Sequence, residues 1–136
     1  MANDLIEQAF LETLWQIDGF GPENTSRGDY NVLSNGGSQW IVVEYNGFEK
    51  SQFTGNLKDT IFWKLQYLLF IQDVDGSTSK KAAILRQAIM DRLQQEPRLG
   101  IPNNVFDSNI ISGSQLPPLF EGLYSEELTC QIQEIR

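Results

Sequence analysis

The sequence predicts an α+β fold in which a small antiparallel sheet packs against three main helices. Alternation of apolar and polar residues with a period of two is confined to an early segment and the last one, whereas helical spacing occupies the beginning and the middle. The chain has 136 residues, of which 40% are hydrophobic. This is enough for one core, so we expect residues 1–136 to form a single globular domain.

The first predicted element is an amphipathic helix over residues 4–17. Its apolar residues recur every three or four positions: Leu5, Ile6, Ala9, Phe10, Leu14 and Ile17. Asn3 or Asp4 can cap the first turn by accepting hydrogen bonds from its free amides. Two glycines and Pro22 follow, so we expect the helix to end there and a loop to continue to residue 28.

A β-hairpin is predicted over residues 29–45. Two runs, 29–34 and 38–45, flank Asn35-Gly36-Gly37, and such residues tolerate the positive φ of tight turns. The second run is apolar on both faces, which predicts a central or covered strand. Two strands alone are marginal in water, so we expect a third. Residues 128–135 are the candidate, although the end of a helix begun at Ser125 stays open for this segment.

Two further helices are predicted in the middle of the chain, over residues 57–72 and 79–96. The first is apolar nearly all round, which favours a core helix, with an aromatic patch for a partner as the alternative. Pro97 ends the second helix. The acidic loop that begins at Asp73 lacks the glycine and glutamate positions of a calcium-binding loop, so we predict no metal there. Residues 98–124 are predicted to be irregular, with a short extended run at 105–111 and a helical turn at 119–124.

Charge is distributed unevenly along the chain, which has a formal net charge of −8. Residues 1–49 carry eight acids against Arg27 alone, whereas residues 50–100 carry eight bases against five acids. A protein with a pI near 4.4 repels nucleic acids and anionic lipids and attracts basic partners. The longest apolar window, 61–71, is too short for a membrane span, and the first residues lack signal-peptide features, so we expect a cytoplasmic protein.

The composition argues against catalysis. The chain has no histidine, which removes the commonest general base and most zinc sites, and it has no phosphate-binding glycine motif. Its one cysteine, Cys130, lies among acids that disfavour a thiolate, so we expect it to be buried and structural. We therefore predict a protein that binds without cofactor or metal, with a carboxylate-based enzyme as the remaining alternative.

In size, acidity and lack of catalytic residues, the chain resembles small intracellular inhibitors such as the immunity proteins of bacterial competition systems. The resemblance implies that it neutralises a basic toxin domain, for example a nuclease, by mimicking a nucleic-acid backbone. The candidate partner-binding residues are the acids Asp18, Glu23, Asp29, Glu44 and Glu49 and the aromatics Trp15, Phe20 and Tyr30, with Trp40 as a further aromatic candidate. The alternatives are a phage or plasmid inhibitor of a host defence enzyme and a structural or assembly subunit. A second copy of the chain stays open as a partner.

Overall fold

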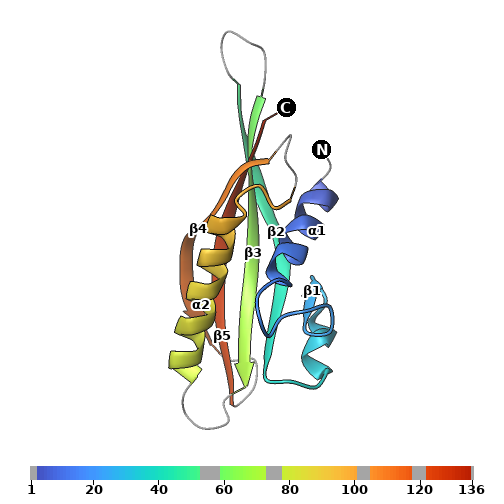
Figure 1. Ribbon diagram of the computed structural model, residues 1–136, viewed down its shortest axis with the longest axis vertical. Coiled ribbons are helices and arrows are strands. Elements are labelled where there is room, and N and C mark those ends of the chain that lie inside the picture. The colour runs from blue at the N-terminus through green and yellow to red at the C-terminus, as the bar shows by residue number, and fades with distance from the viewer. Residues whose placement is uncertain (1–2, 53–58, 73–77, 101–104, 118–121, 136) are drawn as a thin grey trace.

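The structure, a computed structural model, describes residues 3–52, 59–72, 78–100, 105–117 and 122–135 (Figure 1). The elements in chain order are α1 (Asn3–Leu14), β1 (Thr25–Arg27), the 3₁₀-helix η1 (Tyr30–Ser34), β2 (Gln39–Gln52), β3 (Asp59–Gln72), α2 (Thr78–Gln95), β4 (Val105–Leu116) and β5 (Leu123–Ile135).

The strands form one five-stranded mixed sheet in the order β1-β2-β3-β5-β4. The short β1 pairs in parallel with residues 41–43 of β2, and every other neighbouring pair is antiparallel. The predicted arrangement, a small antiparallel sheet with three main helices at 4–17, 57–72 and 79–96, is therefore wrong. The described residues hold two α-helices, one 3₁₀-helix and a sheet dominated by long strands.

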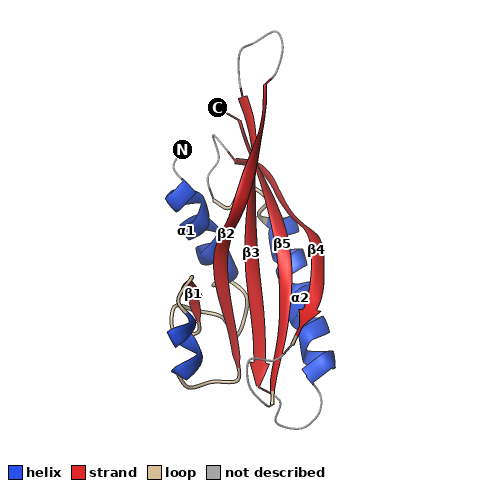
Figure 2. Ribbon diagram, turned by 180° about the vertical axis from the view of Figure 1, so that it is seen from behind, coloured by secondary structure: helices blue, strands red, loops and turns tan. Residues whose placement is uncertain are grey.

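Both α-helices lie on one face of the sheet, which we call the helical face (Figures 1 and 2). Helix residues such as Phe10, Leu14 and Ile89 belong to the same buried cluster as the strand residues of this face. The strand residues are Ile41, Val43, Ile61, Trp63, Leu65, Tyr67, Leu69, Ile71, Leu128, Cys130 and Ile132. The opposite face carries a smaller buried cluster of Val32, Trp40, Val42, Leu68, Phe70 and Leu123 beside η1.

The predicted helix over 57–72 is instead strand β3, in the part of that range that the structure describes. Its odd-numbered residues from Ile61 to Ile71 face the helices, while Leu68 and Phe70 join the cluster on the opposite face. A strand between two neighbours and covered on both faces is apolar throughout, and this pattern cannot be told from a buried helix by periodicity. The pairing of β3 with both β2 and β5 decides between them.

The predicted hairpin over 29–45 is wrong, because only its second run is a strand. Its second run belongs to β2, which continues to Gln52, but its first run forms η1. The Asp29 carboxylate accepts a hydrogen bond from the Asn31 amide at 2.9 Å and so caps this short helix. The antiparallel partner of β2 is β3, with a register shift between Tyr45 and Phe48.

The other predicted elements differ in length. Helix 79–96 is confirmed as α2, and the C-terminal strand at 128–135 is confirmed as β5, which begins earlier, at Leu123. The helix predicted over 4–17 ends at Leu14, because the next amides bond in tighter turns, such as that of Ile17 to the Leu14 carbonyl at 3.0 Å. The run expected at 105–111 extends to Leu116 as β4. The calcium-like loop falls largely on residues 73–77, outside the described residues, as do residues 119–121 of the expected helical turn.

Membrane-spanning helices were also sought among the described residues. Neither α1 nor α2 combines the length and the hydropathy that crossing a bilayer requires.

Candidate functional site

The predicted partner-binding acids do not gather into one cluster. Asp18, Glu23 and Asp29 are exposed in the segment between α1 and η1, whereas Glu44 and Glu49 lie on β2. Glu49 accepts a salt bridge from Lys64 of β3, with its Oε1 3.0 Å from Nζ. These carboxylates are spread along one flank of the molecule, and their role in binding stays a prediction.

Three of the four aromatic candidates are structural. Phe20 is 6% exposed and Trp40 is 5% exposed, so both belong to buried clusters and neither offers a surface anchor. Trp15 is half-buried, and its indole nitrogen donates a hydrogen bond to the Thr25 Oγ1 at 2.7 Å. This contact ties the end of α1 to β1. These three residues follow the commoner fate of aromatic side chains, which is to pack in the core or against it.

Tyr30 is the aromatic candidate that remains exposed. Its hydroxyl donates a hydrogen bond to the Glu44 Oε1 at 2.6 Å, and its ring contacts that of Phe70 edge-on, at a centroid distance of 6.1 Å. Partial burial, with the Glu44 hydrogen bond and charge, raises the pKa of Tyr30 to about 12. Tyr30 also lines an apolar hollow of about 350 Å³ on the face opposite the helices. The structure therefore brings two of the predicted residues together, but in a contact that stabilises the fold.

A groove runs between α2 and the edge strand β4, and sequence analysis did not single it out. Two adjoining hollows of about 430 and 610 Å³ form it, and they share Met90 and Ile110 as lining residues. Gly113 lies opposite Leu128 in the sheet, and a side chain at Gly113 would come within 3.3 Å of it. Met90 and Ile111 are exposed apolar side chains at this groove. We call this feature the α2/β4 groove.

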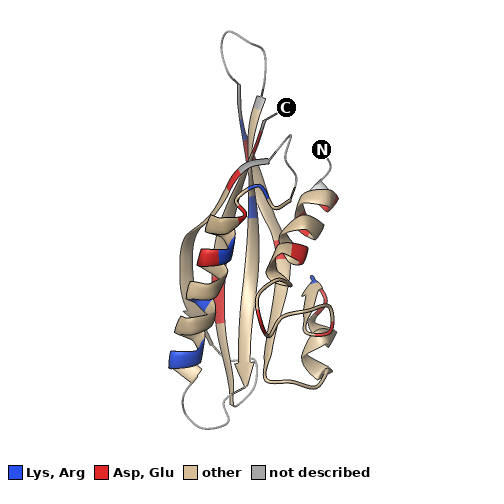
Figure 3. Cartoon of the chain, in the orientation of Figure 1, with Lys and Arg blue, Asp and Glu red and all other residues tan. Residues whose placement is uncertain are grey.

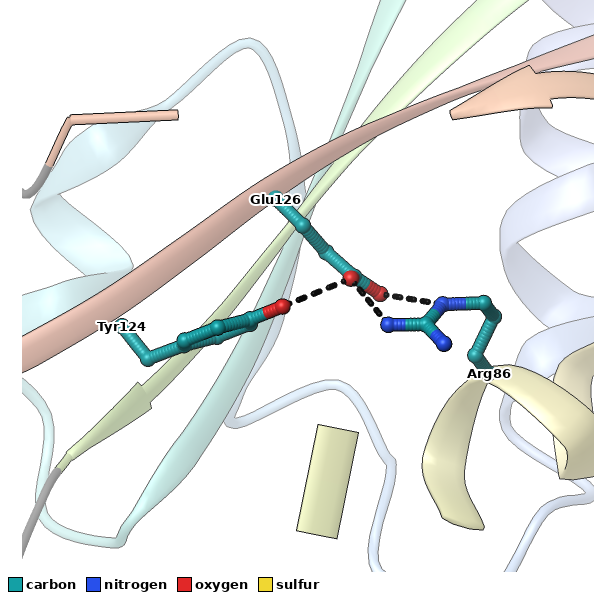
Figure 4. A network of polar contacts seen from close by, with 3 residues as sticks. All are labelled: Arg86, Tyr124 and Glu126. Carbon is teal, nitrogen blue, oxygen red and sulfur yellow. Dashed lines mark hydrogen bonds and ion pairs between the residues drawn. The ribbon is translucent and has the colours of Figure 1, made fainter. Parts of the chain in front are cut away.

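A polar network forms part of the floor of the α2/β4 groove (Figure 4). The Arg86 Nε lies 3.1 Å from the Glu126 Oε1, and the Arg86 Nη2 lies 2.5 Å from the Glu126 Oε2. Tyr124 donates its hydroxyl to the same Oε2 at 3.0 Å. Hydrogen bonding to Glu126 raises the pKa of Arg86, and burial, followed by the bond to Glu126, raises the pKa of Tyr124. Arg86 and Tyr124 both donate hydrogen bonds to the Glu126 carboxylate. The network therefore attaches α2 to β5 rather than presenting a reactive base.

Cys130 is buried beneath the helices, as predicted. Burial raises the pKa of its thiol well above the usual value, so the nucleophilic thiolate is disfavoured. In the part of the chain that the structure describes, no group of three or more Cys, Asp and Glu side chains is arranged to hold a metal ion.

Two exposed aromatic residues lie on β2, also outside the predicted site. Tyr45 and Phe48 pair with Leu65 and Trp63 of β3 on the helical face. Their rings lie 6.4 and 5.3 Å from the Trp63 ring, measured between centroids. The alternation of apolar and polar residues predicted a strand as far as Tyr45. Because the register shifts after Tyr45, alternation alone does not show that Phe48 lies on the same face.

Comparison with known proteins gives a fold likeness alone. No protein-family model matches the chain, and no curated protein does. Among solved structures, a chain described as part of the virion of a native gene transfer agent particle superimposes with a TM-score of 0.59. The sequences are 8% identical over the match, which covers 96% of this chain and 95% of the other. The likeness therefore spans the whole fold.

Proposed function

We propose that this chain is an assembly subunit that joins a multi-subunit protein particle through the edges of its sheet. The observation that carries the proposal is that both edges of a long sheet lack a covering strand over most of their length. Within the described residues, β4 pairs with β5 on one side only, and β1 covers just residues 41–43 of β2. In the part of the chain that the structure describes, no strand pairs with the outer edge of β2 beyond Val43 or with the outer edge of β4.

Such edges are normally protected. Natural proteins place lysine, proline or inward-pointing charges on an edge strand, because exposed amides and carbonyls pair with other chains. Strand β4 contains neither lysine nor proline, and Asp107 is its one charged residue. It has two register irregularities, which give part of the usual protection. An edge strand of this composition is suited to controlled pairing with a partner.

The fold likeness supports the same proposal. The gene transfer agent chain is part of a virion, and its fold matches nearly all of this chain. The predicted cytoplasmic location is kept as part of the proposal.

Sedimentation of the particle fraction tests this function. Large assemblies from cells that produce the chain would be separated on a density gradient, and the chain followed by mass spectrometry. We expect it to sediment with other particle proteins at a constant ratio, and an Ile111→Lys variant, with a charge on the β4 edge, to remain in the low-mass fractions. An Ile84→Lys variant is the control, because Ile84 is exposed on α2 and lines neither groove hollow. Wild-type chain confined to the low-mass fractions would refute the proposal.

Inhibition of a basic toxin domain stays as the second candidate, supported by exposed carboxylates such as those of Asp18, Glu23 and Asp29. For such an inhibitor, association with the partner should slow steeply as salt rises, because long-range attraction acts before contact. Stopped-flow mixing at several salt concentrations would measure this. An association rate unaffected by salt and by reversal of Glu23 and Asp29 would contradict it.

A further inference from the structure

The directions of the long strands allow the sheet to continue into a second copy of the chain. Across the order β2-β3-β5-β4, each strand is antiparallel to the next. The two outer strands of this set of four therefore run in opposite directions. A second copy placed beside the first in the same orientation brings its β2 antiparallel to β4, which is the favourable pairing for adjacent strands.

The exposed aromatic residues of β2 lie at the level of the α2/β4 groove. The pairing registers connect Tyr45, Leu65, Cys130 and Ile110 in one row across the sheet. The next row towards the end of β2 contains Phe48, Trp63, Ile132 and Ser108. Both Ile110 and Ser108 line the groove. A neighbouring copy at the same height would thus bring its Tyr45 and Phe48 to the groove-lining part of β4.

The two surfaces also lie on the same face. Tyr45 is 46% exposed and Phe48 is 53% exposed, and both are on the helical face, where the α2/β4 groove opens between α2 and the sheet. A sheet that continues through a neighbouring copy keeps its helical face on the same side. The two rings would therefore enter the groove beside Met90 and Ile110 instead of pointing away from it.

Charge favours the same contact. The flank that carries α1, β1 and η1 has six carboxylates against Arg27 alone over residues 3–35, and Arg27 pairs internally with Asp4, at 2.7 Å. The opposite flank carries α2, which has four basic residues against Asp91; Arg86 pairs internally with Glu126 and Arg92 with Glu96, whereas Lys80 and Lys81 are exposed. Figure 3 shows the acidic residues of α1 and of the segment after it near the β1/β2 edge of the sheet, and most of the basic residues of α2 near the β4 edge. Copies arranged side by side place unlike charges together.

We propose that copies of this chain join head to tail, with residues 44–52 of β2 from one copy pairing with β4 of the next and with Tyr45 and Phe48 seated in its α2/β4 groove. This contact rests on the proposed assembly function and names its partner, a second copy of the chain. It is heterologous, because each copy contributes a different surface to each neighbour. Repetition gives a closed ring or an open filament.

Complementation between two variants tests the contact. Tyr45→Ser with Phe48→Ser removes the aromatic pair, and Met90→Lys with Ile111→Lys charges the groove and the β4 edge. Ile84→Lys is the matched control on α2. Size-exclusion chromatography with light scattering should show wild-type and control chains forming oligomers larger than dimers as concentration rises. Each double variant should associate at least tenfold more weakly, which corresponds to about 1.4 kcal/mol or more.

An equimolar mixture of the two double variants is the decisive sample. Each keeps one intact surface, so the mixture should form a heterodimer that cannot grow further. Circular dichroism of each variant would establish that the fold is retained, as expected for exposed positions. If two β4 edges paired with each other instead, the Tyr45→Ser, Phe48→Ser variant would associate as strongly as the wild-type chain. That result would overturn the proposal.

Disulfide trapping gives a second measurement that does not depend on weakening the contact. A Tyr45→Cys chain mixed with an Ile111→Cys chain should form a cross-linked dimer, while Tyr45→Cys mixed with Ile84→Cys should not. The native Cys130 is buried and should not contribute. Absence of the specific cross-link, together with a monomer at every concentration, would overturn the head-to-tail contact. The chain could still sediment with particles in that case, which separates failure of this contact from failure of the assembly function.

Discussion

The Arg86→Ala variant should lower the free energy of unfolding by about 3 kcal/mol. This cost should exceed that of Glu126→Gln, which removes the negative charge of its partner. The reason is the unequal burial of the two ions. The Glu126 side chain is 5% exposed, whereas that of Arg86 is 38% exposed. Removing the arginine leaves a mostly buried carboxylate without its cation, while removing the negative charge leaves an arginine that is already partly exposed to water.

The magnitude follows from what each variant leaves behind. Breaking a buried ion pair by deleting one partner costs about 3 to 5 kcal/mol, and the lower end applies because Tyr124 still donates to Glu126 and the site is partly open. Glu126→Gln keeps an oxygen that accepts from Arg86, so a cost of about 1 kcal/mol is expected. Since the double variant contains no buried charge, it should cost about 2 kcal/mol, below the additive sum.

Urea unfolding monitored by tryptophan fluorescence would measure these differences. With a slope of about 2 kcal/mol per molar urea, the midpoint should fall by about 1.5 M for Arg86→Ala and about 0.5 M for Glu126→Gln. Lys64→Ala is the control, because it removes a salt bridge to Glu49, whose side chain is 70% exposed, and should cost less than about 1 kcal/mol. Equal costs for Arg86→Ala and Glu126→Gln, or strict additivity in the double variant, would refute the argument from burial.

Three further predictions concern single side chains. Because the folded pKa of Tyr30 is raised from 10.0 to about 12, the stability it contributes is complete below pH 10 and lost as pH rises towards 12. Tyr30→Phe should therefore reduce the alkaline loss of stability in a series of urea melts, and an unchanged pH profile would contradict this. The Cys130 thiol should react with a thiol reagent only after denaturant is added, because burial raises its pKa; rapid labelling of native protein, followed by absorbance, would show the reverse. Leu69→Ala, in the centre of β3, should lower the free energy of unfolding by about 3 kcal/mol. Leu5→Ala, on the exposed side of α1, should change it by less than about 0.5 kcal/mol. Similar urea midpoints for the two variants would contradict this difference.

The sequence did not predict the α2/β4 groove, and a role of the acidic candidates in binding stays a prediction. The acids of the N-terminal third were read directly from composition, and Asp18, Glu23 and Asp29 are indeed exposed. The aromatic anchors could not be predicted in the same way, since an aromatic residue serves a core as readily as a surface. Phe20 and Trp40 became buried, while Tyr45 and Phe48, which had not been singled out, remained exposed. Exposure is a property of the neighbours that pack on a side chain, and those neighbours are distant in sequence.

Local signals determined the elements whose pattern has one interpretation. The amphipathic stripe of α2, with Pro97 after it, specifies its own conformation, because the residues that bury one face of this helix all lie within a short stretch of chain. Only the tertiary structure decided the conformation of residues 59–72, which are apolar on both faces as a strand and would be apolar all round as a helix. Hydrogen bonding to β2 and β5 on either side makes them a strand, and β5 lies more than 50 residues further along the chain. The α2/β4 groove has the same origin: Arg86 and Glu126 are 40 residues apart, and their contact exists because β5 inserts between β3 and β4.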